Sequence, residues 1–264
     1  MRIVRFCSAV LLSGFAFAAQ ATMVHRPVEW TQSGTRFHSV LVYDDASSAK
    51  RPGLVMVPNW YGVNDAAVKK AEMIAGKDYV ILLTDMYGAD VRPQQGNAEQ
   101  AQAAVKPLYA NRDLMRQRIN EALAQLKAQA KSAPIDTAKL AAIGFCFGGA
   151  AVLDLARSGA DIAAVASFHG DLSTDDPSQA KHIKARVLAM NGADDRGTMP
   201  DADKFMDEMR QSPADWQFVV LGHAVHCFTE VGENSPGCKY DAKAAARSYG
   251  LMRAWLREAF LGRD

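Results

Sequence analysis

A cysteine flanked by glycines, where an apolar strand runs into a small-residue helix, limits the fold of this chain most strongly. The apolar run 140–145 leads into Gly144–Gly149 (GFCFGG), and the helical pattern 147–157 follows at once. Strand, sharp turn and helix make up the beginning of a strand–helix unit, in which glycine lets the strand and the helix pack closely. The motif therefore favours an α/β fold with Cys146 at the turn.

The rest of the chain repeats this alternation of apolar strands and helical patterns. Strands that are apolar throughout are buried on both faces, as in a mostly parallel sheet flanked by helices on both faces. Such alternation implies right-handed βαβ units. The run 35–43 alternates more clearly, which predicts an antiparallel edge strand. The other predicted strands are 54–58, 79–84, 162–168, 187–190 and 216–221, and the other predicted helices are 64–77, 98–110, 112–131, 202–211 and 241–260.

The charge balance argues against whole classes of partner. The 264 residues include 30 Lys and Arg against 29 Asp and Glu, a net charge of +1, so the chain has no overall attraction to nucleic acid or to an anionic membrane. The hydrophobic fraction of 49% is ordinary for a folded globular protein. Because no repeat or linker interrupts the pattern, we expect residues 22–264 to form a single domain.

The first 21 residues have the organisation of a signal peptide. Arg2 and Arg5 precede the apolar run 6–19, and Ala19 and Ala21 complete an A-x-A pattern. The run is too short for a stable membrane span, with an uncleaved anchor as the alternative. We therefore expect cleavage near Ala21 and a periplasmic or secreted protein that has no integral membrane association after cleavage.

Cys146 has the setting of a catalytic nucleophile. A glycine-flanked turn holds such a residue in strained backbone geometry at the start of a helix. There the helix dipole favours a thiolate, and the N–H of Phe147 points towards an oxyanion that forms on the substrate. The alternative is a buried structural thiol in a glycine-rich turn.

Two later loops supply a carboxylate and then a histidine, which is the order that an elbow nucleophile requires. Asp194 and Asp195 follow one predicted strand, at the end where parallel sheets hold their ligands. His226 follows the next strand and is the candidate base, oriented by an aspartate. A metal site that includes His223 and His226 is a weaker alternative. We expect His169 at the rim of the same pocket, or in a hydrogen-bonding role behind the base.

After export, three cysteines divide into one pair and one free thiol. Cys227 and Cys238 lie eleven residues apart, across a loop that contains glycine and proline. We expect these two to form a disulfide that holds the loop after His226, with two free thiols as the alternative.

The chain resembles the dienelactone hydrolase family of α/β-hydrolases over roughly residues 50–260. This resemblance implies the α/β-hydrolase fold and a triad of Cys146, His226 and Asp195, with Asp194 as the reserve acid. It also places a second oxyanion donor at the N–H of Trp60. The blocks that carry it are 55–62 (VMVPNWYG), 84–88 (TDMYG), 144–149 (GFCFGG), and 192–195 (GADD) with 226–228 (HCF).

Several positions depart from the family pattern. Asn59 stands where the family has a glutamate that exchanges a proton with the thiol, and an amide cannot take that proton. Ala89 and Glu230 stand where the muconate-lactone enzymes have two arginines that hold the substrate carboxylate. Arg92 lies close enough to substitute, with a solvated loop charge as the alternative. Because Glu230 would repel an anionic substrate, we expect a different, uncharged ester or lactone.

Aromatic side chains beside these motifs are the expected apolar walls of the pocket, with ordinary core packing as the alternative for each. The residues expected in the pocket or its walls are Asn59, Trp60, Tyr61, Tyr87, Arg92, Phe147 and His169.

The leading interpretation is thus a thiol-nucleophile hydrolase of a small-molecule ester or lactone, with no metal or organic cofactor. Two other functions remain open. One is a non-catalytic ligand-binding protein on the same fold. The other is a thiol redox protein in which Cys146 pairs with Cys227 or Cys238.

Overall fold

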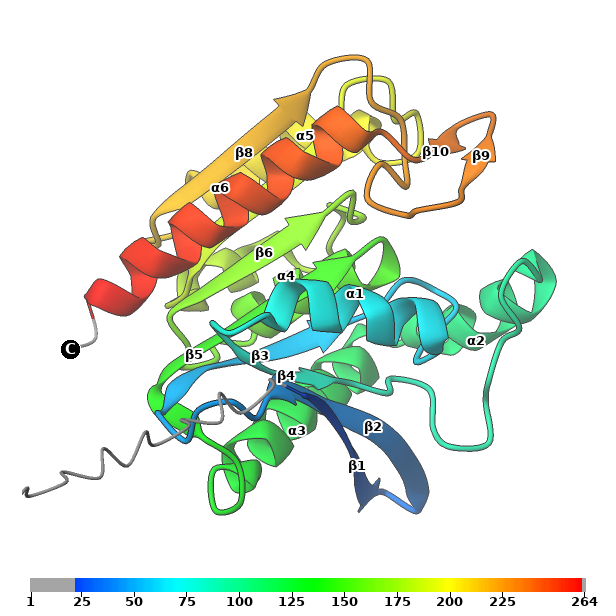
Figure 1. Cartoon of the computed structure of the whole chain (residues 1–264). Helices are drawn as coiled ribbons and strands as arrows, with labels where there is room; N and C mark the ends of the chain where they lie inside the picture. The colour runs from blue at the N-terminus through cyan, green and yellow to red at the C-terminus, as the bar shows by residue number, and fades with distance from the viewer. Residues whose placement is uncertain (1–21, 263–264) are drawn as a thin grey trace, which may run out of the picture.

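An eight-stranded sheet runs through the described part of the protein (Figure 1). The computed structural model describes residues 22–262, so the predicted signal peptide, 1–21, lies outside the described residues. The strands are β1 (Met23–Gln32), β2 (Thr35–Asp44), β3 (Arg51–Val57), β4 (Val80–Leu83), β5 (Ile135–Phe145), β6 (Ala164–Phe168), β7 (Arg186–Gly192) and β8 (Trp216–Leu221). Their order is β1-β2-β4-β3-β5-β6-β7-β8, and the six strands from β4 to β8 in this order are parallel.

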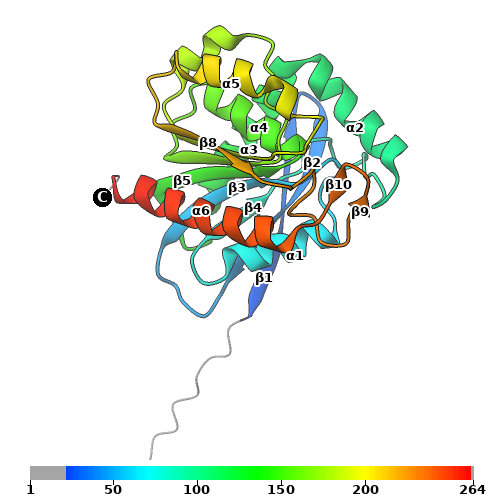
Figure 2. The same ribbon diagram turned by 90° about the horizontal axis from the view of Figure 1, so that it is seen from above.

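Helices cover both faces of the sheet (Figure 2). They are α1 (Asp65–Ala75), α2 (Ala98–Ala110), α3 (Arg112–Gln129), α4 (Phe147–Arg157), α5 (Ala202–Met209) and α6 (Ala242–Leu261). Alternate residues of β3 enter two separate cores. Leu54 and Met56 pack in the core with α1 and α6, whereas Val55 and Val57 pack in the core with α2 to α5. A strand with two covered faces is apolar at every position, and the predicted α/β fold is confirmed.

The edge strand at the antiparallel end of the sheet is β1, not the strand predicted there. We expected 35–43 to lie at the edge, but β1 pairs with β2 along its whole length. Ser33 and Gly34 form a two-residue hairpin turn, and both have positive φ, 48° and 79°. Only two residues of β1, Val28 and Trp30, are buried, so its sequence needs little apolar alternation. This weak pattern is why the sequence did not predict it.

The two helices that share one face of the sheet begin at capping side chains. Asn64 accepts a hydrogen bond from the N–H of Ala67 at the start of α1, and Asp241 accepts one from Ala244 at the start of α6, each at 2.9 Å. Such caps satisfy N–H groups that a helix leaves unpaired, and so they determine where the helix begins. Both starts lie next to the loops that carry the candidate site.

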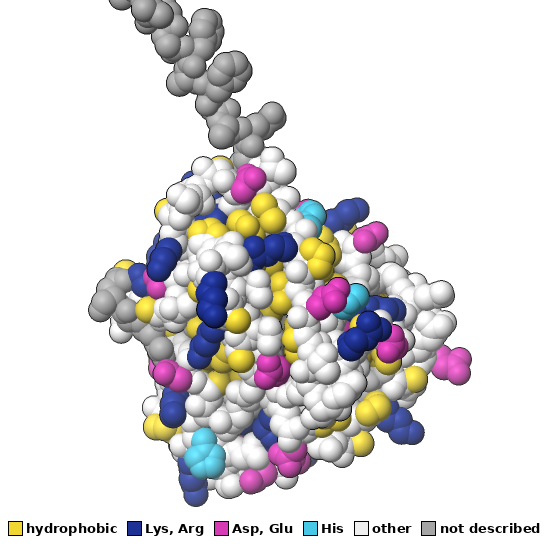
Figure 3. All heavy atoms as spheres, turned by 90° about the horizontal axis from the view of Figure 1, so that it is seen from below, with side chains coloured by type: hydrophobic (Ala, Val, Ile, Leu, Met, Phe, Trp, Pro, Cys, Tyr) yellow, Lys and Arg dark blue, Asp and Glu magenta, His cyan; other side chains and the backbone are white. Residues whose placement is uncertain are grey.

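Charged side chains of both signs are interspersed on the face shown in Figure 3. Hydrophobic atoms lie between them, and no extended area of one sign is visible there. This mixture agrees with the net charge of +1. None of the helices within residues 22–262 combines the length and the apolar character that crossing a bilayer requires.

Candidate active site

Cys146 lies at the turn between β5 and α4, at the carboxyl edge of the sheet. Its φ of 53° is positive, a conformation that costs a residue with a side chain some strain. The neighbouring glycines permit the turn. A Cβ on Gly144 would overlap the carbonyl oxygen of Gly148, and a Cβ on Gly148 would overlap that of Val57. The turn thus has the geometry predicted for a nucleophile elbow.

Cys146, His226 and Asp195 lie in hydrogen-bond contact. The Sγ of Cys146 is 3.1 Å from Nε2 of His226, and Nδ1 of His226 is 2.7 Å from Oδ2 of Asp195. Thr198 Oγ1 also donates to Asp195, at 2.7 Å, which holds the carboxylate in place. The structure therefore selects between the two candidate acids, because Asp195 is buried beside His226 whereas Asp194 is exposed.

The electrostatics of this triad favour the protonated form of His226. Burial by itself would lower the pKa of His226, but the Cys146 thiolate and the Asp195 carboxylate raise that pKa to about 10. Burial likewise acts to raise the pKa of Asp195. The hydrogen bond and the charge of His226, aided by Thr198, outweigh burial and hold this pKa below its usual value. His226 is thus protonated at neutral pH.

Two backbone N–H groups are the predicted oxyanion donors. That of Phe147 is the first in α4, where no preceding helical carbonyl accepts its hydrogen bond. That of Trp60 lies in the loop after β3. The Asn59 side chain accepts from the N–H of Tyr61 at 3.0 Å, and the Tyr87 hydroxyl donates to the carbonyl of Trp60 at 3.0 Å. These bonds hold the loop on both sides of the Trp60 N–H.

The triad opens into a cavity of about 1250 Å³. Cys146 and His226 both line it, so the thiol is accessible and is not the sealed structural cysteine of the alternative interpretation. The remaining wall is formed by Tyr109, Phe147, Asp171, residues 193–200, Val225, Pro236 and Gly237.

Most of the residues predicted for the pocket do not line this cavity. Tyr61 and Tyr87 are buried in the core, which is the packing role left open by the sequence. Arg92 pairs with Asp85 at 3.0 Å, so this guanidinium is not available for a substrate carboxylate. The predicted residues that fall outside the cavity are Asn59, Trp60, Tyr61, Tyr87, Arg92 and His169.

Residues from distant segments of the chain line the triad cavity instead. Tyr109 comes from the end of α2, and Pro236 and Gly237 come from the loop between β9 (Asn234–Ser235) and β10 (Cys238–Lys239). No local motif marks Tyr109 as a site residue. The predicted disulfide was the one sequence signal that pointed to the 236–237 loop.

His169 lies behind His226, fully buried, and not at the pocket rim. Its Nε2 is 2.7 Å from Oγ1 of Thr229, whose hydroxyl donates to Glu230 at 3.1 Å. Because that hydroxyl has one proton, it must accept from His169, which therefore has the Nε2–H tautomer. Burial, together with the positive charges of His226 and Lys70, lowers the pKa of His169 well below its usual value. A neutral His169 supports the ring of His226 edge-on, with centroids 5.0 Å apart.

Glu230 joins several of the segments around the triad. Its carboxylate accepts from Asn59 Nδ2 at 2.7 Å, accepts from Thr229, and forms an ion pair with Lys70 of α1. The Glu230 and Lys70 side chains are only 10% and 12% exposed. Lys70 balances the charge of Glu230, which lines a different cavity from the triad. The expected repulsion between Glu230 and an anionic substrate is therefore wrong.

Cys227 and Cys238 form the predicted disulfide. Next to it, the N–H of Lys239 donates to the carbonyl of His226 at 2.9 Å, so β10 is held against the loop of the base. Cys146 is the free cysteine of the described residues. Both thiols that could resolve an oxidised Cys146 are bonded to each other, which removes the support for the redox alternative.

The alternative metal pair finds no support in the described residues. His223 is exposed, while His226 faces Cys146. Within residues 22–262, no group of three or more His, Cys, Asp or Glu side chains is arranged to hold a metal ion.

Comparison with known proteins identifies the family. A sequence model of the dienelactone hydrolase family matches residues 37–260, which is most of the chain. The chain belongs to the dienelactone hydrolase family. As a member of this family it is a hydrolase of carboxylic esters or lactones. The alternative of a non-catalytic binding protein is thereby set aside.

Similar proteins agree with this assignment. The crystal structure of a dienelactone hydrolase-like promiscuous phosphotriesterase from metagenomic libraries has a TM-score of 0.82 and 37% identity, covering 90% of this chain and 98% of that one. An uncharacterized protein of Caenorhabditis elegans is 38% identical over 137 residues, which are 49% of this chain and 87% of that protein. A probable 2-oxo-3-(5-oxofuran-2-ylidene)propanoate lactonase of Bradyrhizobium sp is 25% identical over 217 residues, 77% of this chain and 84% of that protein. The similarity in structure confirms the predicted α/β-hydrolase fold.

Proposed function

We propose that this protein is an exported hydrolase of uncharged carboxylic esters or lactones that acts through an acyl-thioester on Cys146. One observation carries the proposal: the Sγ of Cys146 lies 3.1 Å from Nε2 of His226, at the wall of an open cavity. A thiolate beside an imidazolium is both nucleophilic and supplied with an acid for the leaving group.

In the first half-reaction, the Cys146 thiolate attacks the carbonyl carbon of the substrate. A C–S bond forms, and one electron pair of the C=O bond moves to oxygen, where the N–H groups of Trp60 and Phe147 stabilise the oxyanion. The C=O bond then re-forms as the C–O bond to the leaving group breaks. The leaving oxygen takes the proton of His226, and an acyl-thioester remains on Cys146.

In the second half-reaction, neutral His226 accepts a proton from water as the water oxygen attacks the thioester. Collapse of this second tetrahedral intermediate breaks the C–S bond and releases the carboxylic acid. The thiolate of Cys146 and the imidazolium of His226 are then restored. Asp195 holds the imidazole by Nδ1 throughout, in the orientation that directs Nε2 to the sulfur.

The charges around the cavity support an uncharged substrate. Among the lining residues outside the triad Arg196 is the single cation, and two carboxylates, those of Asp171 and Asp194, line the same cavity. A substrate carboxylate would therefore meet no pair of cations at this wall. Arg92, the one replacement that the sequence offered, is paired with Asp85.

A substrate panel tests the reaction. Purified protein and Cys146→Ala are compared on neutral and anionic esters and lactones, with a neutral phosphotriester included because one similar protein is described as a promiscuous phosphotriesterase. We expect turnover of the neutral esters or lactones, loss of nearly all of it in Cys146→Ala, and an acyl adduct on the Cys146 peptide in mass spectra after rapid acid quenching. Equal turnover by Cys146→Ala would reject the mechanism, and a preference for anionic substrates would reject the substrate class.

Export is proposed from the pattern of residues 1–21 and is consistent with the Cys227–Cys238 disulfide, since such bonds persist in oxidising compartments. The full chain is expressed in a Gram-negative host, and periplasmic and cytoplasmic fractions are analysed by intact mass. We expect a periplasmic product that begins at Thr22. A product that retains Met1–Ala21 in the cytoplasm contradicts the proposal.

A further inference from the structure

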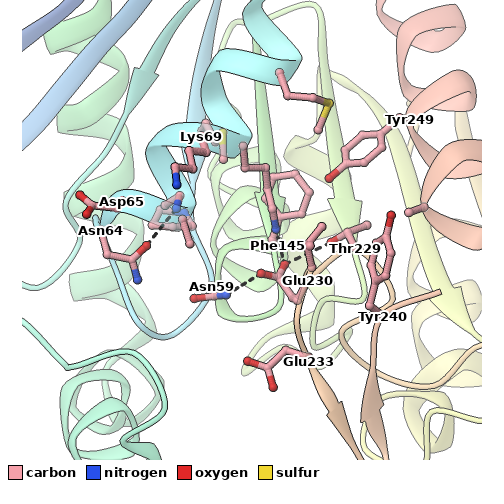
Figure 4. Close-up of a pocket in the computed structure, with 18 of the residues that line it drawn as sticks. Asn59, Asn64, Asp65, Lys69, Phe145, Thr229, Glu230, Glu233, Tyr240 and Tyr249 are labelled. Atoms are coloured by element: carbon pink, nitrogen blue, oxygen red, sulfur yellow. Dashed lines mark hydrogen bonds and ion pairs between the residues drawn. The ribbon is translucent and has the colours of Figure 1, made fainter. Parts of the chain in front are cut away.

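A second cavity, of about 1050 Å³, opens between α1 and α6 (Figure 4). It shares no lining residue with the triad cavity. Its floor includes Met56 of β3 and Phe145 of β5, which are neighbouring strands. The helices that follow these strands, α1 and α4, pack on opposite faces of the sheet. When the helices after two neighbouring strands of an open α/β sheet lie on opposite faces, a crevice remains at the carboxyl ends of these strands, and ligands bind there.

The walls of this second cavity are largely apolar and aromatic. From α1 it is lined by Asp65, Ala66, Ala67, Lys69, Lys70 and Met73, and from α6 by Ala242, Ala245, Ala246 and Tyr249. Positions separated by three or four residues share one face of a helix, so each helix turns a single face to the cavity. The alanines on these faces leave room between the helices, and Figure 4 shows the rings of Tyr240 and Tyr249 beside that space. Walls of this kind suit a flat aromatic molecule.

The charges of the lining exclude a preference for anions. Two lysines, Lys69 and Lys70, stand against three carboxylates, those of Asp65, Glu230 and Glu233. The buried members of this set, Lys70 and Glu230, are already paired with each other. The cavity therefore offers no unpaired buried cation to a ligand. Of its two tyrosine hydroxyls, that of Tyr249 is hydrogen-bonded to Thr229, and that of Tyr240 can exchange a hydrogen bond with a ligand.

We propose that this cavity is a second binding site, for an uncharged aromatic molecule that carries a hydroxyl group, and that it is separate from the site of the reaction. The cavity is in contact with the neighbours of the reacting groups and not with the groups themselves. Asn59 precedes Trp60, Phe145 precedes Cys146, and Glu230 follows His226 by four residues. A ligand there leaves Cys146 free, so blocking the thiol should not prevent its binding.

The test is direct binding of N-phenyl-1-naphthylamine, an uncharged aromatic probe that fluoresces in apolar surroundings. It is titrated into the protein before and after Cys146 is alkylated with iodoacetamide. Ala246→Trp and Ala242→Trp fill the cavity from exposed positions of α6, and Lys243→Trp places the same side chain on a neighbouring exposed position that does not line it. Because all three positions are exposed, the variants should keep the fold, which thermal unfolding checks.

We expect saturable binding of one probe per chain, unchanged within about twofold by alkylation and by Lys243→Trp, and weakened at least about tenfold by either cavity-filling variant. Phenol should displace the probe, and benzoate at the same concentration should not. Binding that survives both Ala246→Trp and Ala242→Trp, or that is lost on alkylation, would overturn the proposal, as would equal displacement by benzoate. No step of this test depends on hydrolysis, so its outcome is independent of the proposed function.

Discussion

The Sγ of Cys146 lies 3.1 Å from Nε2 of His226, although eighty positions separate the two residues in the chain. The contact forms because β5 and β8 belong to one parallel sheet, whose strands deliver their following loops to the same edge. The pKa of His226 rises to about 10 in this position, mainly through the charge of the thiolate acting against burial. The two groups are therefore electrostatically coupled, and removal of the thiol should change the pKa of His226.

Removal of the thiolate should lower the pKa of His226. We expect the ring C–H signals of His226 to titrate near pH 10 in the wild type and at clearly lower pH in Cys146→Ala, because the largest influence that raises this pKa is gone. NMR titration of the histidine ring signals measures both values. Cys146→Ser, with a neutral hydroxyl, should behave as Cys146→Ala does. Identical titration in all three proteins would disprove the ion pair.

The same shift predicts how stability depends on pH. The folded-state pKa of His226 lies above its ordinary value of 6.5, so the interaction stabilises the fold fully below pH 6.5 and is lost as pH rises through about 10. Wild-type stability should therefore decline more steeply than that of Cys146→Ala between about pH 8.5, where a thiol of the unfolded chain loses its proton, and about pH 10. Urea unfolding at several pH values measures the difference, and parallel curves for the two proteins would contradict it.

Asp195→Asn should lower kcat by about 100- to 10,000-fold, since an amide cannot stabilise the imidazolium or keep the correct tautomer. Asp194→Asn is the matched control, because Asp194 is the preceding residue of the same loop and its side chain is exposed. The kcat of this variant should stay within about twofold of the wild type. Steady-state hydrolysis of an activated neutral ester measures both. If the two variants lose activity equally, Asp195 does not have the role proposed for it.

Glu230→Gln should destabilise the protein by about 3 kcal/mol, because it leaves the buried ammonium of Lys70 without its counter-charge. Replacing both partners, in Lys70→Met with Glu230→Gln, should recover most of this loss, since no unpaired buried charge remains. Denaturant unfolding of the two single variants and the double variant gives the coupling directly. Additive losses would show that the ion pair is not coupled as the structure indicates.

Replacing both bridged cysteines by serine should lower the free energy of unfolding by about 2–3 kcal/mol, the loop-closure entropy expected for a bond of this span. The KM for esters should also rise, because Pro236 and Gly237 of the same loop line the triad cavity. Thermal unfolding and steady-state kinetics measure the two effects. Dithiothreitol should reproduce them in the wild type and have no further effect on the double variant. A wild type that is insensitive to reduction would contradict the structural role of the bond.

The sequence predicted the turn at Cys146 and the position of His226 more accurately than the residues around them. The elbow at Cys146, the placement of His226 after a strand and the Cys227–Cys238 pair could be predicted because each rests on short-range chemistry: glycine spacing, the end of an apolar strand, and a short loop between cysteines. Pocket residues depend instead on which side chains meet across the fold. Tyr109 lines the triad cavity from another helix, whereas Tyr87, which belongs to the motif 84–88, is buried and packs against Phe147.

The pairing of charged and polar side chains could not be predicted from the sequence either. Asn59 and Glu230 could be recognised from the sequence as departures from the family pattern, but not as each other's hydrogen-bond partners across 171 positions. The choice of Lys70 as the counter-charge follows from the packing of α1 beside the loop of Glu230. Such pairing was therefore beyond prediction, and the charge assigned to the pocket on the basis of Glu230 was wrong.

By itself, the sequence determined the fold class, the strained turn that carries Cys146 and the order in which Cys146, Asp195 and His226 follow their strands, because steric rules and apolar periodicity act over a few residues. Only the tertiary structure decided that Asp195 holds His226, that Glu230 pairs with Lys70 and that a second cavity lies between α1 and α6. These features arise where segments distant in the chain pack together. Their geometry is set by long-range burial and hydrogen bonding, which local pattern does not encode.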